Sequence, residues 1–218
     1  MPEQRPGPEG GRRARNRQLK TEALCHAALE LFLKSGIESV TIEQIASNAG
    51  VAKGSFYRYF KDKTELVETL LRSLQSAFTE AMNQCRQDLE QVENRIQLFE
   101  AYRTLGQTLA EPMITQAGLV QLYLQESRAP GVGARAPVRT LALEIGRQAI
   151  ELGWVAHDRG LLRPIDPRVA ALTVVGAVER LLFGFLAGED VGPPLAAPEA
   201  LVSIILDGLN LRGVDSGS

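Results

Sequence analysis

The segment TIEQIASNAGVAKGSFYRYFKDK, residues 41–63, constrains the fold of this chain more than any other stretch. Thr41 can accept a backbone N–H with its hydroxyl, and Gln44 follows three residues later, as in a helix capping box. Gly50 can take the left-handed conformation that ends a helix without steric cost. A second short helix is predicted over residues 52–60, and a third begins soon after it. Two short helices joined by a tight, glycine-containing turn form a helix-turn-helix.

The predicted helix over residues 52–60 combines basic, aromatic and small residues, a mixture that suits contact with nucleic acid. Gly54 costs about 1 kcal/mol relative to alanine within a helix, but it lets the backbone approach another surface closely. Lys53 and Ser55 beside it are placed to reach base edges, and Arg58 can bind a base or a phosphate. We predict phosphate contacts for the other members of the DNA-binding set, which are Thr41, Tyr57, Tyr59 and Lys63.

Residues 17–71 resemble the DNA-binding domain of the TetR family of bacterial transcription regulators. The resemblance rests on the pattern ALCHAALELFLKSGIESVTIEQIASNAGV and on the signature AKGSFYRYFKDKTEL. Tyr59 stands where many members have histidine, and either side chain can donate a hydrogen bond to a phosphate. The resemblance implies an all-α protein of about nine helices. In such a protein, a three-helix DNA-binding domain precedes a helical domain that binds a small-molecule effector and forms a dimer.

We expect four segments along the 218 residues. A disordered tail over residues 1–14, rich in proline and glycine, precedes the helix-turn-helix domain over residues 15–62. An effector-binding and dimerisation domain follows over residues 63–212, with a short disordered tail over 213–218. Helical periodicity predicts helices over 15–35, 63–91, 94–110, 113–127, 138–157, 168–187 and 199–211, with Pro112 as a helix break and 129–137 as a loop.

The charges divide between the two ends of the chain. Residues 1–63 contain 11 Lys and Arg against 7 Asp and Glu, a net charge of +4, whereas residues 64–218 contain 13 and 19, a net charge of −6. The cationic end can meet phosphates, and the acidic remainder is unsuited to DNA. Four arginines follow the N-terminal tail and form either an arm that reaches DNA or a solvated segment; they are Arg12, Arg13, Arg15 and Arg17.

Large side chains of the second domain are candidates for an effector cavity, because aromatic walls with a few polar groups suit an apolar or amphipathic small molecule. The candidates that the resemblance suggests are Phe78, Met82, Phe99, Tyr102, Arg103, Tyr123, Glu126, Trp154 and His157. Ordinary core packing is the alternative for each aromatic residue. The last two helices are apolar around much of their circumference, so we expect a homodimer interface at Val174, Val178, Leu182, Phe185, Leu201, Ile204 and Ile205.

Several classes of protein fit the sequence poorly. We find no metal-ligand spacing, phosphate loop or nucleophile motif, so we expect no enzyme activity, no metal and no cofactor. Cys25 and Cys85 lie among apolar neighbours and are expected to be buried free thiols. No signal peptide and no stretch of about 18 apolar residues stands out, and we therefore expect a cytoplasmic protein without a membrane partner.

The favoured function is a transcriptional regulator that binds a palindromic operator as a dimer and is released by a ligand, most simply as a repressor. A helical carrier of small molecules without DNA-binding activity is the alternative, although it leaves Gly54 and the cluster over residues 57–63 unexplained. A DNA-binding architectural protein without an effector is a further alternative. The effector, the operator sequence and the regulated genes are not readable from the residues.

Overall fold

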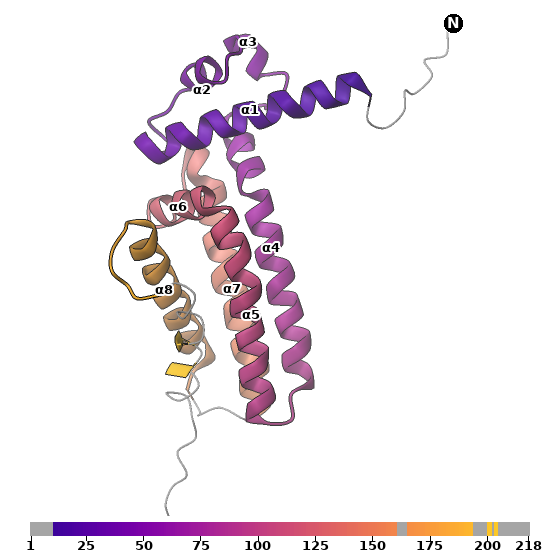
Figure 1. Ribbon diagram of the computed structural model, residues 1–218, viewed down its shortest axis with the longest axis vertical. Helices are drawn as coiled ribbons and strands as arrows, with labels where there is room; N and C mark the ends of the chain where they lie inside the picture. The colour runs from indigo at the N-terminus through magenta and orange to yellow at the C-terminus, as the bar shows by residue number, and fades with distance from the viewer. Residues whose placement is uncertain (1–10, 161–164, 194–199, 202, 205–218) are drawn as a thin grey trace, which may run out of the picture.

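The computed structural model describes residues 11–160, 165–193, 200–201 and 203–204. Across these residues the regular elements are eight α-helices and one short 3-10 helix, which confirms the all-α class. Helix α1 (Arg12–Ser35) crosses the top of a bundle of longer helices, and α2 (Ile42–Asn48) and α3 (Lys53–Phe56) lie on its outer side (Figure 1). We call α1 to α3 the head and the helices that follow them the body.

The capping and turn signals of the head are confirmed. The Thr41 hydroxyl accepts a hydrogen bond from the Gln44 amide at 3.2 Å, and the Gln44 side chain accepts one from the Thr41 amide at 2.8 Å. Gly50 has a φ of 65°, as the turn after α2 requires. Helix α1 begins at Arg12, three residues before the expected boundary at residue 15.

Helix α3 is shorter than the predicted helix over residues 52–60, which was wrong at its C-terminal end. After Phe56 the chain tightens, because the Arg58 amide donates to the Ser55 carbonyl at 3.2 Å and the Tyr59 amide to the Phe56 carbonyl at 2.9 Å. These two bonds span three residues and tighten the chain into a turn, and the Phe60 amide closes it with a bond to the Phe56 carbonyl at 3.1 Å. The turn directs Phe60 back into the core, where it is 3% exposed.

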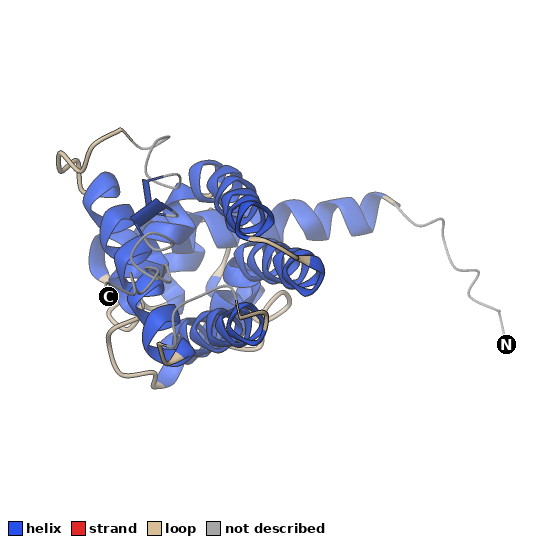
Figure 2. Cartoon of the chain, turned by 90° about the horizontal axis from the view of Figure 1, so that it is seen from below, coloured by secondary structure: helices blue, strands red, loops and turns tan. Residues whose placement is uncertain are grey.

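The body contains α4 (Lys63–Gln91), α5 (Arg95–Thr115), α6 (Ala117–Glu126), a 3-10 turn η1 (Gly133–Arg135), α7 (Ala136–Asp158) and α8 (Pro167–Leu186). Helices α4, α5 and α7 run side by side, and α8 packs on the outside of this group (Figures 1 and 2). Helix α4 has the predicted bounds, with Asp62 accepting from the Glu65 amide at 2.9 Å as its cap. Asp166 caps α8 in the same way.

Two predicted boundaries in the body were wrong. Pro112 lies inside α5, which continues to Thr115, because its carbonyl still accepts a bond from the Gln116 amide at 2.9 Å. Helix α6 consequently begins at Ala117 and not at residue 113. The loop predicted over residues 129–137 contains the 3-10 turn and the start of α7. The expected tail over residues 213–218, most of the helix over 199–211 and residues 1–10 of the N-terminal tail lie outside the described residues.

One core joins the head to the body. Phe32 of α1, Ile45 of α2 and Phe56 of α3 are all fully buried, and they share a cluster with Leu66 of α4 and Val138 of α7. A second cluster fills the lower part of the body between α4, α5 and α7, around Met82, Leu89 and Leu98. The head therefore sits on the body through apolar contacts and not through a flexible linker.

The prediction that no apolar stretch is long enough to span a membrane was wrong for α8. Its 20 residues have a mean hydropathy of 1.9 in the most apolar window, which is 11% buried, and in length and composition they could cross a bilayer. Glu179, however, lies in this helix and accepts a hydrogen bond from Tyr123 of α6 at 2.6 Å. That contact makes the inner side of α8 part of the helical body.

The two cysteines are expected to resist alkylation in the native protein. Both thiols are free, but only Cys85 is buried as expected, whereas Cys25 is half-buried. Burial raises the pKa of Cys25 to about 11 and the pKa of Cys85 to about 12. Since the thiolate is the reacting form, the raised pKa lowers the thiolate fraction of Cys25 about 100-fold, and that of Cys85 further still. We expect iodoacetamide at mildly alkaline pH to label neither residue rapidly, and both after unfolding in urea. Labelling is measured by mass spectrometry. Rapid labelling of the native protein would show that burial does not protect these thiols.

Candidate nucleic-acid interface

The surface formed by α3 and its following turn is open to an approaching partner. A Cβ atom built on Gly54 would meet nothing within 4 Å, so the backbone there faces free space. Lys53 and Arg58 on either side are exposed, and Ser55 is half-buried. This arrangement places cations and a bare stretch of backbone at one surface, which is what contact with phosphates and base edges requires.

The polar side chains of this surface are held by weak contacts. Lys53 pairs with Glu43 of α2 at 3.0 Å, with the two side chains 58% and 71% exposed. An exposed pair of this kind contributes about 0–1 kcal/mol and can be exchanged for a contact with DNA. Arg58 donates from Nη2 to the Ser55 hydroxyl at 2.9 Å. Both cations are therefore positioned near the surface but remain available.

Two neighbouring tyrosines have different environments. Tyr57 is 56% exposed, and its ring packs edge-on against the buried Phe56 with centroids 5.6 Å apart. This contact orients the Tyr57 ring outward and leaves its hydroxyl at the surface. Tyr59 is half-buried and packs against the core cluster of the head. Of the two predicted phosphate ligands, Tyr57 has the more accessible position.

Lys63 has an internal role that the sequence did not predict. Its ammonium group donates to the carbonyls of Ile37 at 2.7 Å, Val40 at 2.8 Å and Glu38 at 3.2 Å. Burial lowers its pKa, while the charge of Glu38 acts in the opposite direction. Because three carbonyls occupy the three donors of an ammonium group, this geometry favours Lys63 as a brace of the loop between α1 and α2 over the predicted phosphate contact. The Thr41 hydroxyl is similarly occupied in the capping box.

A buried carboxylate connects this loop to the body. Glu126, at the end of α6, is 5% exposed and accepts a hydrogen bond from the Ile37 amide at 2.9 Å through Oε1. Its other oxygen accepts from the guanidinium of Arg135. The amide of Arg135 in turn donates to Glu38 at 3.1 Å. We call this group of Ile37, Glu38, Glu126 and Arg135 the head–body junction.

The predicted effector residues do not form one site. Four of them, Phe78, Met82, Phe99 and Tyr102, share the cluster between α4, α5 and α7. Glu126 belongs to the head–body junction instead, because the Ile37 amide and Arg135 use both its oxygens. The remaining candidates are dispersed: Tyr123 donates to Glu179, Arg103 pairs with Glu100, and Trp154, 43% exposed, stacks edge-on with His157.

A groove with a volume of about 370 Å³ lies between the first turns of α4 and α7. Thr64, Glu68 and Arg72 of α4 face Pro137 and Thr140 of α7 across it. None of the predicted effector residues lines this groove. The groove beside the head and the cluster of Phe78, Met82, Phe99 and Tyr102 are therefore two separate features of the body.

Known bacterial regulators are similar in sequence to this chain, in the head and in part of the body. The profile of the family described as "Bacterial regulatory proteins, tetR family" matches residues 24–70, which contain α2 and α3. The HTH-type transcriptional regulator RutR of Escherichia coli (strain K12) is 27% identical over 165 residues, covering 72% of this chain and 71% of RutR. The HTH-type transcriptional regulator TcmR of Streptomyces glaucescens is 38% identical over 82 residues, which are 37% of this chain and 36% of TcmR.

Solved structures share the whole fold. NalD, the secondary repressor of the MexAB-OprM multidrug efflux pump in Pseudomonas aeruginosa, superposes with a TM-score of 0.71 at 21% identity, over 91% of this chain and 99% of NalD. FadR from Bacillus subtilis in complex with stearoyl-CoA gives a TM-score of 0.65 at 16% identity, over 87% and 99% of the two chains. An exposed helix-turn-helix on a helical body defines a DNA-binding transcriptional regulator. The head of this chain matches the DNA-binding domain of the TetR family of bacterial regulators, and the body shares the fold of regulators of that family.

Replacement of Lys53 by alanine is expected to relax base preference at one position of the binding site. Lysine can donate to guanine O6 and N7, and a good base contact discriminates by about 1–3 kcal/mol. The measurement is selection of binding sites from random duplexes by the wild-type protein and by Lys53→Ala. An unchanged preference at every position would remove Lys53 from the residues that read bases.

Tyr57→Phe is expected to weaken binding to all duplexes by a similar factor. The substitution removes only the exposed hydroxyl, whose predicted partner is a phosphate, and phosphates carry no direct sequence information. A lost neutral hydrogen bond of this kind corresponds to about 0.5–1.5 kcal/mol. Titration of several selected duplexes provides the test, and a loss confined to one sequence would assign Tyr57 to base readout instead.

Proposed function

We propose that this protein is a ligand-released repressor that binds a palindromic operator as a homodimer in the cytoplasm. Its helix-turn-helix places a DNA-reading surface at one end, and the body offers the elements that effector binding and dimer formation need. The observation that carries the proposal is the head–body junction. A carboxylate of α6 holds the loop that enters α2, so a movement of α6 would change the position of the head.

The body supports an effector site near α4. Phe78 and Met82 of α4 pack with Phe99 and Tyr102 of α5 in the lower cluster, which suits an apolar or amphipathic small molecule that separates these helices. Helix α4 continues from this cluster to Lys63 and to Leu66, which packs against the head. A shift of α4 on effector binding would therefore reach the loop that Lys63 braces, and DNA and effector would weaken each other's binding by the same factor.

Helix α8 supports a dimer. It exposes large apolar side chains, including Val169 at 61%, Phe183 at 46% and, beside Gly146 of α7, Leu172 at 52%. An apolar face of this extent on a soluble protein marks an interaction surface. Phe185 and Ile204 of the expected interface are also exposed, whereas Val174, Val178, Leu182 and Leu201 are half-buried, and the side chain of Ile205 lies outside the described part of the chain. Two copies joined there would present two recognition helices to a two-fold operator.

The first experiment is selection of duplexes from random DNA, followed by footprinting of the selected site at low and at high salt. A two-fold symmetric, salt-sensitive footprint is the expected result. Sedimentation of the free protein and of Val169→Glu then tests the dimer, since a buried unpaired carboxylate at the interface should shift the protein to the monomer. Failure to select any duplex would leave the helical carrier as the better function.

Effector release requires a separate measurement. A library of apolar and amphipathic compounds is screened for release of the selected duplex, and each active compound is then titrated into free and DNA-bound protein. Unequal affinities in the two states are expected by linkage. Equal affinities would reject a ligand-released repressor and favour a DNA-binding protein without an effector.

A further inference from the structure

The first turns of α1 carry cations along one face. Arg13, Arg17 and Lys20 follow one another at steps of four and three residues, which places them on a single side of an α-helix. Leu24 continues this line after four more residues, and it is 0% exposed within the core of the head. The same side of α1 is therefore cationic before Leu24 and apolar and buried from Leu24 onward. We call Arg13, Arg17 and Lys20 the cationic stripe.

The opposite side of α1 packs on the body. A Cβ atom built on Gly118 of α6 would lie 3.4 Å from Leu29 and 3.8 Å from Leu33, so these two leucines contact α6. Arg15 precedes Leu33 by 18 residues, which is five helical turns, and so it points to the side of the body. The cationic stripe thus faces away from α6, toward the side of α1 on which α2 and α3 lie (Figure 1).

Within the described ranges of the chain, the cations of the stripe have no acidic partner. All three side chains are exposed, and in the part of the chain that the structure describes they form no ion pair. Arginines of the body behave differently, as Arg86 pairs with Glu90 and Arg103 with Glu100. Unpaired cations raise the local positive potential and remain free to bind an anionic partner.

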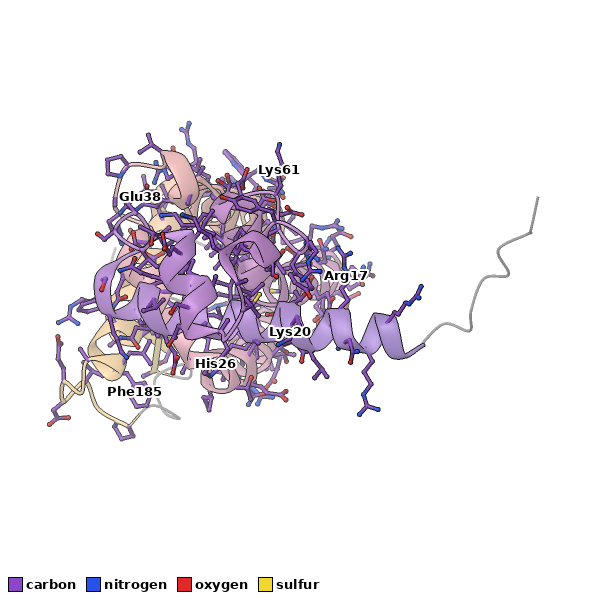
Figure 3. The ribbon with its side chains drawn as sticks, turned by 90° about the horizontal axis from the view of Figure 1, so that it is seen from above. Arg17, Lys20, His26, Glu38, Lys61 and Phe185 are labelled. Atoms are coloured by element: carbon purple, nitrogen blue, oxygen red, sulfur yellow. The ribbon has the colours of Figure 1, made fainter. Side chains whose placement is uncertain are left out.

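The stripe also projects from the molecule. The first turns of α1 extend beyond the body, and Arg17 lies on the side of α1 that faces Lys61, next to the turn after α3 (Figure 3). The stripe and the surface of α3 therefore lie on the same side of the head. A duplex held by α3 carries a phosphate about every 1.7 Å of its axis, and so it presents negative charge along the length of this projection.

We propose that Arg13, Arg17 and Lys20 bind phosphates of the duplex that α2 and α3 read, so that α1 extends the DNA contact beyond the helix-turn-helix. The inference rests on the DNA-binding function of the family and adds a surface outside the recognition segment. These contacts would strengthen binding to all sequences equally, because phosphates do not distinguish bases.

The test compares single substitutions on the two faces of the same helix. Arg17→Gln removes a charge from the stripe, and Arg15→Gln removes the same charge two residues away on the side of the body. The dependence of binding on salt is measured with a labelled mixed-sequence duplex and full-length protein. Counterion release predicts that Arg17→Gln lowers the slope of log affinity against log salt by about 0.9 for each bound protomer. Arg15→Gln and Arg95→Gln, at the far end of the body, should leave the slope unchanged.

The outcomes separate this proposal from the function it extends. Absence of salt-sensitive binding by the wild-type protein would reject the DNA-binding function itself. Normal wild-type binding with equal slopes for Arg17→Gln and the wild type would overturn only the role of the stripe, as would equal losses for Arg15→Gln and Arg17→Gln. Circular dichroism of each variant confirms that α1 is intact, and the triple variant of the stripe should lose a proportionally larger part of the slope.

Discussion

Glu126→Ala is expected to destabilise the protein by about 3–5 kcal/mol, because it leaves the guanidinium of Arg135 without its buried partner. The pair is shielded from solvent, with the side chain of Glu126 7% exposed and that of Arg135 17%. The substitution also removes the acceptor of the Ile37 amide, and an unsatisfied buried donor costs about 1–3 kcal/mol within that total. The free energy of unfolding in urea, at one fixed protein concentration, gives the measurement.

A matched control separates the junction from ion pairs in general. Glu151 pairs with Arg147 on the exposed side of α7, where the side chains are 50% and 55% exposed. Glu151→Ala should change stability by at most about 1 kcal/mol, since exposed pairs contribute little. Glu126→Ala combined with Arg135→Ala should cost less than the two single changes together, because the double variant leaves no unpaired charge. Additive losses, or a loss of Glu126→Ala no larger than that of Glu151→Ala, would show that the two groups are not coupled.

Phe56→Ala is expected to destabilise the protein by about 3–5 kcal/mol and to abolish DNA binding at the working temperature. Phe56 is 0% exposed and packs against Phe60, with ring centroids 5.6 Å apart, in the cluster that joins the head to α4. Removal of the ring leaves a cavity beneath α3, whose four residues have little other support. Urea unfolding and titration of a selected duplex measure the two effects.

Ile96→Ala is the control for this truncation. Ile96 lies in the first turn of α5 at the far end of the body and is 77% exposed, so truncation of its side chain should change stability by less than about 0.5 kcal/mol. Retention of normal stability and DNA binding by Phe56→Ala would mean that α3 does not depend on this ring. The notion that the core of the head positions the recognition surface would then fail.

The recognition segment was predictable because its signals are local. Thr41 and Gln44 form a capping box within one turn, and Gly50 meets the backbone requirement of the turn that follows. The length of α3 was not predictable in the same way. Phe60 must return to the core, and this tertiary requirement converts the end of the predicted helix into a turn.

The grouping of the candidate effector residues was predictable only in part. Phe78, Met82, Phe99 and Tyr102 pack together because α4 and α5 are adjacent antiparallel helices with apolar faces. Glu126 was predicted to be a polar contact of the effector cavity. Its actual partner, the Ile37 amide, is 89 residues away, and no periodicity reports a contact over that distance.

The sequence by itself determined which stretches are helical, the caps at Thr41 and Asp62 and the position of the helix-turn-helix, because these depend on side chains within about four residues of one another. The same spacing determined that Arg13, Arg17 and Lys20 share one face of α1. Only the tertiary structure decided which way that face points and which polar groups the head and body share. Lys63 and Glu126 acquire their roles from carbonyls and amides that the chain brings to them from 26 and 89 residues away.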